Sequence, residues 1–331
     1  MVLVTLSNGK RFEAASTSSI LDAAAQNHIN LPYSCKTGRC SSCKCKVSKG
    51  KTRALRAETG LTEEEKADGW ILSCVRVVET DVVLEVDDLG GTDLPVPKIS
   101  PCRISAIKSL APDVVQVLLR LPPAADFRFI PGQYVDVIGP KSIRRSYSFA
   151  NANFDDKQIE LHIRAVEGGA MSDYWFNLAK PNDLLRLHGP LGTFFLRDMA
   201  SLDLIFLATG TGIAPVKAML ESMANISAAK MPKSVTVFWG GRKPKDLYFD
   251  VSQIPLSHVY IPVLSRSEDE WEGAKGYVQD VLLNKKPDLT SAAVYACGSD
   301  AMIQSARTSL IEAGLPAKRF YSDAFVNSGS N

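Results

Sequence analysis

The spacing of its cysteines constrains this chain more than any other feature. Three cysteines follow one another as Cys35-x4-Cys40-x2-Cys43, and Cys74 comes after a further thirty residues. Three thiolates from one loop and a fourth from a distant segment form the set that holds a [2Fe–2S] cluster. The sequence therefore predicts an iron–sulfur centre with these four cysteines as its metal ligands.

Three other roles for the cysteines are the alternatives: a zinc site, a redox-active dithiol, or buried structural thiols. Zinc ligands usually come as two Cys-x2-4-Cys pairs, and only one such pair is present. A dithiol needs Cys40 and Cys43 alone and leaves Cys35 and Cys74 unexplained. The total of seven cysteines is odd, which argues against a disulfide framework. Cys45 lies outside the spacing, and we expect it to be a buried thiol.

Composition excludes several classes of protein. The 331 residues are 45% hydrophobic and 22% charged, as in ordinary globular proteins. The net charge of +2 is too small to indicate a basic surface for binding nucleic acid or an anionic membrane. No run of about 18 apolar residues predicts a membrane span. The first ten residues alternate apolar and polar side chains, unlike a signal peptide, so we expect a cytoplasmic protein.

Changes in composition and in the order of strand-like and helical runs along the chain predict three domains. Residues 1–90 contain the cysteine cluster and end in a strand-like run. A stretch rich in Gly, Pro and Asp follows, and we place a linker at 91–98. Residues 99–197 hold short strand-like runs between turn signals, which favour an antiparallel barrel or sandwich. Residues 198–331 alternate strands with helices, which favours a parallel sheet.

Two short motifs in the second domain suit a flavin and its phosphates. Arg145 and Tyr147 lie on one face of a predicted strand, because strand side chains alternate. A cation for a phosphate and an aromatic ring for a planar cofactor would then point the same way. Residues 168–172 (GGAMS) place small residues and a hydroxyl at a helix start, where an anion can bind. Each motif alone also has an explanation that needs no ligand. The first is an ordinary exposed strand face, and the second is a helix cap by Ser172.

Two turns in the third domain predict a dinucleotide site. Residues 209–215 (TGTGIAP) lie between a strand and a helix, where glycines let the backbone approach a pyrophosphate. Pro215 at the first helical position would lose no hydrogen bond. Residues 295–300 (YACGSD) end another strand, and Cys297 by itself reads as a small buried apolar residue. A plain tight turn is the alternative for the first motif.

The cysteine segment resembles a plant-type ferredoxin over about residues 3–88. The flavin and nucleotide motifs together resemble the ferredoxin–NADP reductase superfamily. This resemblance implies a β-grasp ferredoxin domain, an antiparallel flavin-binding β-barrel of six strands, and an α/β parallel-sheet nicotinamide-binding domain. Among its members the CDP-deoxysugar reductases are the most similar, on segments that include PCR at 101–103, GPLGTFF at 189–195 and FYSDAF at 320–325.

The resemblance also implies roles for individual residues. The FAD ring and ribityl chain would be held by Arg145, Tyr147 and Ser148, and its pyrophosphate by His162, Arg164, Gly169, Met171 and Ser172. NADH or NADPH would lie on Thr209, Gly210, Gly212 and Pro215, with Cys297 and Gly298 beside the nicotinamide. Phe325 would cover the flavin, and Ser265, Arg266 and Lys275 have the spacing used for the extra phosphate of NADPH. Tyr147, Ser148 and Cys297 would thus form the catalytic centre.

The implied function is electron transfer. A nicotinamide gives two electrons as hydride, an iron–sulfur cluster takes one at a time, and flavin is stable at both stages. The chain would therefore pass electrons from NADH or NADPH through FAD and the [2Fe–2S] cluster to a protein partner. The resemblance implies a PMP-dependent sugar dehydratase as that partner, or alternatively a mono- or dioxygenase component. Two hypotheses from other classes stay open: an iron–sulfur carrier or sensor with a degenerate reductase half, and a free-standing NAD(P)H–flavin reductase.

Overall fold

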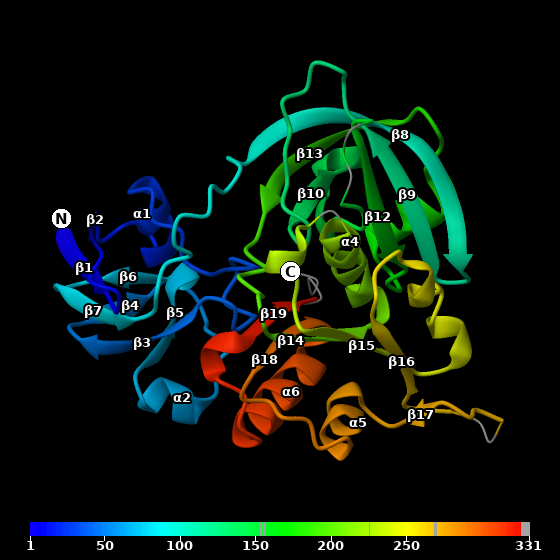
Figure 1. Cartoon of the computed structure of the whole chain (residues 1–331). Helices are drawn as coiled ribbons and strands as arrows, with labels where there is room; N and C mark the ends of the chain where they lie inside the picture. The colour runs from blue at the N-terminus through cyan, green and yellow to red at the C-terminus, as the bar shows by residue number, and fades with distance from the viewer. Residues whose placement is uncertain (153, 155, 225, 268–269, 326–331) are drawn as a thin grey trace. The chain divides into compact units, whose positions relative to one another are not determined.

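A computed structural model describes residues 1–152, 154, 156–224, 226–267 and 270–325. The described chain divides between Leu94 and Pro95 into two units, which Figure 1 colours from blue to red along the sequence. The last six residues of the predicted nucleotide domain, 326–331, lie outside the described residues.

The first unit is a five-stranded mixed sheet with a helix packed on it. Its strand order is β2-β1-β7-β3-β5, with β1 parallel to β7, and β4 and β6 form a separate ladder. Ser19 caps the first helix by accepting the Asp22 N–H at 3.1 Å. The elements are β1 (Val2–Leu6), β2 (Arg11–Ala14), α1 (Ile20–Gln26), β3 (Lys44–Lys49), β4 (Thr52–Ala54), α2 (Glu63–Ala67), β5 (Trp70–Leu72), β6 (Arg76–Val78) and β7 (Val82–Glu85). This is the β-grasp arrangement that the resemblance to plant-type ferredoxins implies.

The segment just after β7 is held against this first unit. The Leu89 N–H donates to Asn30 O at 2.8 Å, and the Asn30 side chain donates to Thr92 O at 3.4 Å. Asp88 accepts from Lys10 Nζ at 2.6 Å. Part of the stretch whose composition predicts a linker is therefore fastened to the ferredoxin-like unit by hydrogen bonds.

The second unit begins with six antiparallel strands. Their order is β11-β10-β13-β8-β9-β12, and an isolated antiparallel bridge between Phe149 and Leu161 joins the two outer strands, so the sheet closes. Phe149, Leu161 and Val135 are among the fully buried residues of its core. The elements are β8 (Lys98–Ala111), β9 (Val114–Arg120), β10 (Tyr134–Ile138), β11 (Arg144–Ser148), β12 (Gln158–Arg164), α3 (Ala170–Asp173) and β13 (Leu184–Leu191).

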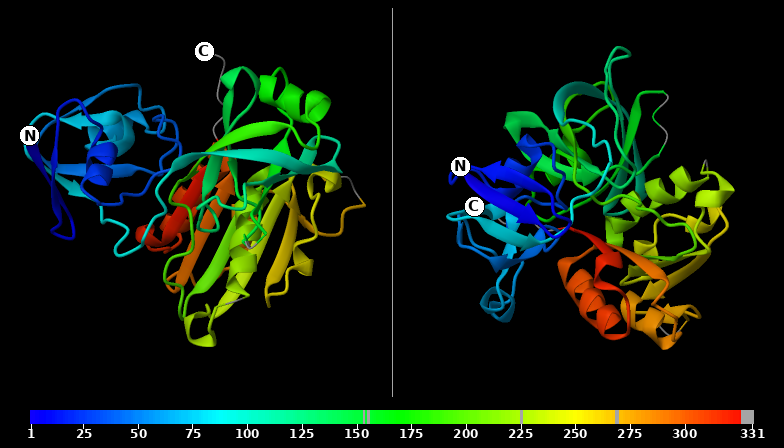
Figure 2. Two further views of the ribbon diagram at one scale, coloured as in Figure 1. Left: turned by 90° about the horizontal axis from the view of Figure 1, so that it is seen from above. Right: turned by 60° about the vertical axis from the view of Figure 1, so that its left-hand side comes forward.

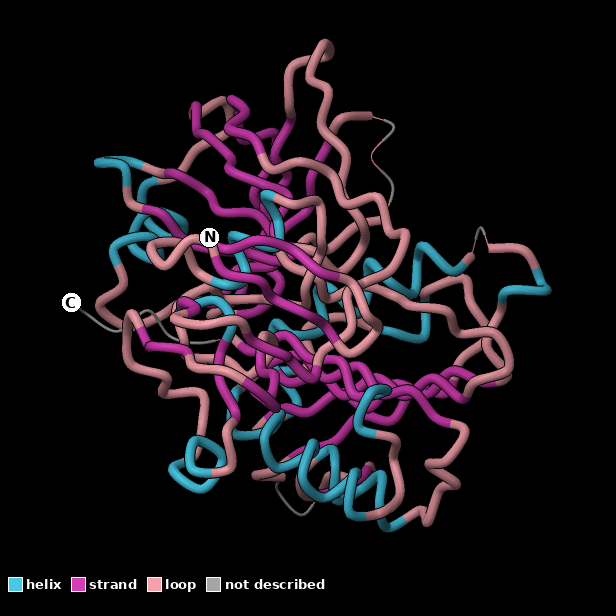
Figure 3. Tube along the Cα trace, turned by 90° about the vertical axis from the view of Figure 1, so that its left-hand side faces the viewer, coloured by secondary structure: helices cyan, strands magenta, loops and turns pink. Residues whose placement is uncertain are grey.

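A six-stranded parallel sheet, in the order β17-β16-β15-β14-β18-β19, completes the second unit. Figures 1 and 2 show α4 on the face of this sheet toward the barrel and α5 and α6 on the opposite face. Figure 3 shows helices running alongside the strands. The elements are β14 (Asp203–Thr209), α4 (Ile213–Met223), β15 (Ser234–Gly241), β16 (Val259–Leu264), β17 (Ala274–Lys275), α5 (Val278–Asn284), β18 (Ala292–Gly298), α6 (Asp300–Glu312) and β19 (Phe320–Ala324). The antiparallel and parallel sheets are those expected from the sequence.

Across the described residues, no helix combines the length and the apolar character needed to cross a membrane.

Candidate cofactor sites

The four predicted ligand cysteines come together in the first unit as two pairs of thiols. Cys35 Sγ lies 3.0 Å from Cys40 Sγ, and Cys43 Sγ lies 3.3 Å from Cys74 Sγ. Three of them come from the loop between α1 and β3, and Cys74 comes from the turn after β5. Within the described part of the chain no three His, Cys, Asp or Glu side chains converge on one point. Two pairs suit two irons with two thiolates each, which is the ligand set of a [2Fe–2S] cluster.

Backbone N–H groups of the same loop point at these sulfurs. The N–H groups of Thr37 and Cys40 each donate to Cys35 Sγ at 3.4 Å, and that of Cys35 donates to Cys40 Sγ at 3.4 Å. The hydrogen bond from Cys40 lowers the pKa of Cys35 to about 4 and raises the pKa of Cys40. Burial instead raises the pKa of Cys45 to about 12. The N–H groups and the Cys40 thiol thus favour a thiolate at Cys35, whereas Cys45 is the buried thiol that was expected.

A second segment, residues 57–60, closes over the cysteine loop. Gly38 has a φ of +77°, and a Cβ there would lie 2.6 Å from Ala57 O, so only glycine allows this approach. The Gly60 N–H donates to Gly38 O at 3.0 Å, and Ser41 Oγ donates to Gly60 O at 2.8 Å. The loop is therefore held in one conformation by its neighbours.

A buried ion pair fastens the same segment to the chain around Cys74. Glu58, whose side chain is 3% exposed, accepts from Arg76 Nη2 at 2.8 Å and Nε at 3.0 Å. Its other oxygen accepts from the Leu72 N–H at 2.7 Å. No motif marked Glu58 in the sequence, because a glutamate in a polar stretch usually lies in solvent.

The predicted flavin residues lie on β11 in the second unit. Arg145 and Tyr147 pair with Val137 and Val135 of β10, so their side chains share one face, as predicted from the alternation. The Tyr147 hydroxyl accepts from Trp175 Nε1 at 3.0 Å, and burial raises the pKa of Tyr147 to about 12. The phenol is therefore fixed and neutral, as a residue that positions a ring must be.

The helix start predicted to bind the pyrophosphate is short and partly engaged. Helix α3 spans four residues after its N-cap Gly169. Met171 is buried in the barrel core, and Ser172 Oγ accepts from the Val166 N–H at 2.8 Å. Because these two side chains are engaged elsewhere, the backbone of this turn is the part that could contact a phosphate.

The two residues of β12 that were predicted to bind the pyrophosphate, His162 and Arg164, lie in different surroundings. The His162 ring is buried, with Nε2 2.7 Å from Glu160 Oε1 and Nδ1 3.2 Å from the Tyr248 hydroxyl. Arg164 instead lies against the nucleotide turn, where its Nη1 would be 3.0 Å from a Cβ at Gly210. Its Nε lies 3.3 Å from Asp113 Oδ2 in an ion pair, and its Nη2 is buried without a hydrogen-bond partner among the described residues. A partly exposed guanidinium with an unused donor beside a glycine turn suits a phosphate group.

The two glycine turns of the nucleotide domain interlock. Strands β14 and β18 are adjacent and parallel, so their carboxyl ends bring Thr209 and Gly298 together. Thr209 Oγ1 accepts from the Ser299 N–H at 3.1 Å, and a Cβ at Gly298 would lie 2.1 Å from that oxygen. A Cβ at Gly212 would lie 2.2 Å from Cys297 O. Glycine is required at both turns for this close approach.

Two details of this region differ from the sequence-based expectation or add to it. Helix α4 begins at Ile213, so Pro215 is its third residue and not its first. The proline is still tolerated because the first four N–H groups of a helix have no partner within it. Cys297 is completely buried, and burial raises its pKa. The Phe325 N–H donates to Gly298 O at 2.8 Å, which places that aromatic residue beside the Cys297–Gly298 turn.

Cationic residues gather where β15, β16 and β17 end. The Ser265 N–H donates to Gly241 O at 2.9 Å, and the Arg266 N–H donates to Arg242 O at 3.0 Å. Lys275 pairs with Leu264, the last residue of β16. Arg266 and Lys275 are therefore neighbours in the fold, and the Arg242 backbone, which comes from a different loop, lies beside Arg266.

Family comparisons agree with this layout. The 2Fe-2S iron-sulfur cluster binding domain matches residues 4–79, the oxidoreductase FAD-binding domain residues 101–196, and the oxidoreductase NAD-binding domain residues 206–308.

Whole-length relatives were also found. The chain is 41% identical over 326 residues to the CDP-6-deoxy-L-threo-D-glycero-4-hexulose-3-dehydrase reductase of Yersinia pestis, which covers 97% of each chain. It is 32% identical over 331 residues to the xylene/toluene monooxygenase electron transfer component XylA of Pseudomonas putida, covering 96% of this chain and 92% of that one. Among solved structures, the Amycolatopsis cytochrome P450 reductase GcoB is 27% identical with a TM-score of 0.73, covering 98% of this chain and 99% of that one.

Proposed function

Because this chain belongs to the family of reductases that join a 2Fe-2S domain to FAD- and NAD-binding domains, we propose that it supplies electrons to a PMP-dependent dehydratase acting on a CDP-6-deoxyhexulose. The reaction would be the reduction associated with CDP-6-deoxy-Δ3,4-glucoseen in deoxysugar synthesis. The observation that carries this choice of partner is the 41% identity, over nearly the whole chain, to a CDP-6-deoxyhexulose-3-dehydrase reductase.

The chain is an NAD(P)H-dependent oxidoreductase that uses FAD and a [2Fe–2S] cluster and delivers electrons to an accepting partner. When bound, the flavin accepts a hydride from the nicotinamide and releases electrons one at a time to the iron–sulfur centre. The protein contributes binding, orientation and electrostatics, and no general base is required.

We assign the iron ligands to Cys35, Cys40, Cys43 and Cys74. Their pairing and the N–H groups aimed at the Cys35 and Cys40 sulfurs support this assignment, because such hydrogen bonds stabilise thiolates and tune a cluster's potential.

In the second unit we assign the FAD ring to Arg145, Tyr147 and Ser148. Arg164 and the backbone of Gly169, Met171 and Ser172 would meet phosphates. His162 would contribute only through its backbone, because its ring is held by Glu160 and Tyr248.

The dinucleotide would lie on Thr209, Gly210, Gly212 and Pro215, with Cys297 and Gly298 near the nicotinamide and Phe325 beside the flavin. Ser265, Arg266 and Lys275, joined by Arg242, would face the adenosine end. We also propose a cytoplasmic location, because the seven free cysteines and the nicotinamide substrate both suit a reducing compartment.

The test is reconstitution with defined acceptors. Holoenzyme loaded with iron, sulfide and FAD is mixed with NADH or NADPH and a PMP-dependent CDP-6-deoxyhexulose-3-dehydrase with its sugar substrate. We expect nicotinamide oxidation coupled to formation of the reduced sugar, and no such product from the Cys74→Ser variant. Parallel reactions use an oxygenase component or free flavin as acceptor. Efficient coupling to the oxygenase alone would favour the XylA-like role, and equal rates with free flavin would favour the flavin-reductase alternative.

A further inference from the structure

A buried group of polar side chains, here called the junction network, links the barrel to the nucleotide domain within the second unit. Its centre is Glu160 on β12. Glu160 Oε1 accepts from Gln116 Nε2 at 2.8 Å and is 2.7 Å from His162 Nε2. Glu160 Oε2 accepts from Lys217 Nζ, on α4, at 3.2 Å. A carboxylate of the barrel thus meets an ammonium group of the nucleotide domain inside the molecule.

The contacts of Lys217 reach the continuation of the flavin strand. Its Nζ also donates to Ala150 O at 2.8 Å and lies 2.7 Å from Glu221 Oε1. The other oxygen of Glu221 accepts from the Ala152 N–H at 3.1 Å. Ala150 follows Ser148 by two residues, and α4 begins at the glycine turn. The helix that presents the nucleotide turn is therefore tied to the strand that carries the flavin residues.

A second path runs from the network to the glycine turn itself. His162 Nδ1 lies 3.2 Å from the Tyr248 hydroxyl, and the Tyr248 ring packs edge-on against Trp239 with centroids 5.1 Å apart. Trp239 Nε1 donates to Gly210 O at 2.9 Å. Barrel, sheet and turn are thus connected by four consecutive side-chain and backbone groups.

The network is buried and charged, so it has few alternative arrangements. The side chains of His162, Lys217 and Glu160 are 2%, 11% and 12% exposed. Burial alone would raise the pKa of Glu160, but the hydrogen bond with His162 and the charge of Lys217 outweigh it and lower the pKa to about 2. Removing Lys217 would leave the buried Glu160 carboxylate without its cation, which is costly.

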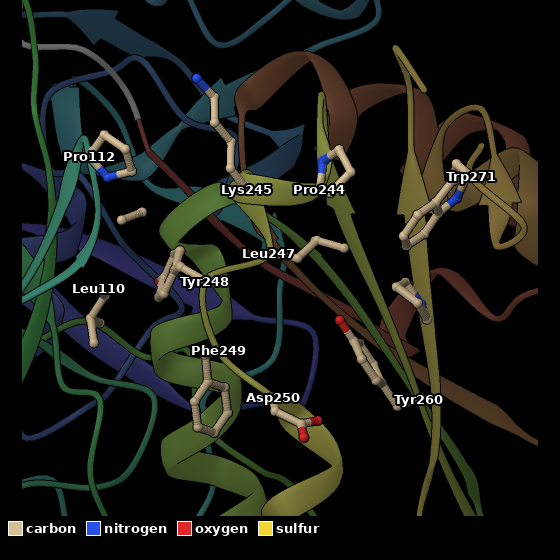
Figure 4. A pocket seen from close by; sticks show the side chains of 12 residues that line it. Leu110, Pro112, Pro244, Lys245, Leu247, Tyr248, Phe249, Asp250, Tyr260 and Trp271 are labelled. Carbon is tan, nitrogen blue, oxygen red and sulfur yellow. The ribbon is translucent and has the colours of Figure 1, made fainter. Parts of the chain in front are cut away.

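On the side of β16 the same two domains together line an open pocket of about 600 Å³. Leu110 and Pro112 of the barrel line one side, and Tyr260 and Trp271 of the nucleotide domain line the other, with Tyr248 at the inner wall (Figure 4).

We propose that Glu160, His162 and Lys217 are positioning residues for hydride transfer. They hold the glycine turn at 209–212 in a set place relative to β11, and so determine how the nicotinamide meets the flavin. In that transfer the hydrogen of the dihydronicotinamide C4–H bond and both electrons of the bond would pass to the flavin and leave NAD(P)⁺, and Glu160, His162 and Lys217 would exchange no atom. This inference rests on the proposed placement of FAD on β11 and of the dinucleotide on the turn.

The variants Glu160→Gln and Lys217→Met test it in the holoenzyme. Each nearly preserves shape and removes one charge. Because a misplacement of about 1 Å can reduce a rate by up to 10²-fold, we expect flavin reduction at saturating NAD(P)H to slow by roughly tenfold. The FAD content and the apparent dissociation constant for NAD(P)H should change less than twofold. The double variant should be no slower than the slower single variant, because both changes break one unit.

Two further measurements separate positioning from general damage. Hydrogen exchange of the amides at 210–214 should be faster in both variants, with or without cofactors. Lys233→Met is the matched control, because Lys233 pairs with Asp203 at 3.4 Å on the surface of the same domain, and it should leave the rate and the exchange unchanged.

Wild-type rates in folded, FAD-loaded Glu160→Gln and Lys217→Met would overturn the inference. So would equal slowing in Lys233→Met, or slowing that only follows lost FAD. If the wild-type flavin is not reduced by either nicotinamide, the proposed function itself fails before the variants are compared.

Discussion

Cys74 and Cys45 are both buried cysteines of the first unit, yet their surroundings differ. Cys74 Sγ lies 3.3 Å from the thiol of Cys43, and hydrogen bonding from that thiol lowers the pKa of Cys74. Both cysteines belong to the apolar core of this unit, but burial raises the pKa of Cys45 to about 12. The difference between the proposed metal ligand and the core thiol therefore lies in what the sulfur faces.

Replacing these two cysteines separately tests the ligand assignment. Cys74→Ser should lose most of its iron, sulfide and visible absorbance, because one of four thiolates is missing. Cys45→Ser should retain all three and lose only some stability. Iron retained in Cys74→Ser and lost in Cys45→Ser would contradict the assignment.

Arg266 and Lys275 are expected to decide between the two nicotinamide cofactors. Each charge-assisted contact with the extra phosphate of NADPH contributes about 1.5–3 kcal/mol, so losing both should raise its KM at least tenfold. We expect the Arg266→Ala/Lys275→Ala variant to show this rise for NADPH and a much smaller one for NADH in steady-state assays. Equal changes in KM for both cofactors would contradict the proposed phosphate site and support NADH as the cofactor.

Glu160 should make the stability of the second unit depend on pH. Its pKa is about 2 in the folded chain against 4.5 as the ordinary value. The stabilisation is therefore complete above pH 4.5 and is lost as pH falls toward 2, by about 3 kcal/mol in total. Denaturant unfolding at pH 6, 4.5 and 3 should show the wild type approaching Glu160→Gln as pH falls; a constant gap would refute this.

At the scale of elements, the β4–β6 ladder carries two arginine ion pairs of opposite character. Arg53 pairs with Glu79 at 3.4 Å, and these side chains are 57% and 46% exposed. Arg76 pairs with Glu58, whose side chain is 3% exposed. Only the second pair closes the segment over the cysteine loop.

The same substitution at both arginines should therefore give different results. Arg76→Met leaves a buried carboxylate without its cation and should cost about 3–5 kcal/mol of unfolding free energy. Arg53→Met should cost about 0–1 kcal/mol. Urea unfolding followed by cluster absorbance measures both, and similar losses would show that the buried pair has no special part in holding the loop.

At the scale of the whole molecule, the proposed cofactor sites are distributed between the two units. The proposed iron–sulfur ligands lie before Leu94 and the proposed flavin and nucleotide residues after Pro95. Each unit has its own apolar core. Hydride transfer should therefore need only the second unit, and delivery to the partner should need both.

A fragment that starts at Pro95 should bind FAD and reduce ferricyanide with NAD(P)H, since a flavin can reduce a small acceptor directly. It should fail to reduce the protein partner at the rate of the full chain. FAD content is measured first, to exclude a misfolded fragment. Equal partner reduction by a loaded fragment and the full chain would take the cluster off the electron path.

The sequence predicted the iron–sulfur centre because three of its four proposed ligands lie in one short segment, Cys35–Cys43, and local spacing is readable without a structure. The two sheets were predictable for the same reason, since alternation and strand–helix order are local patterns. The start of α4 was misplaced by two residues, because Pro215 is compatible with several positions in the first turn of a helix.

By itself the sequence determined the domains' classes, the cysteine set and the glycine turns, because steric and ligand requirements leave few residue types able to fill those places. Only the tertiary structure decided the partners of Glu58 and the junction network. Glu160 and Lys217 are 57 residues apart, and no pattern links them. They pair because closure of the barrel and the crossover connection through α4 bring these two charges, distant in the sequence, together in the interior. There each charge is stabilised by the other.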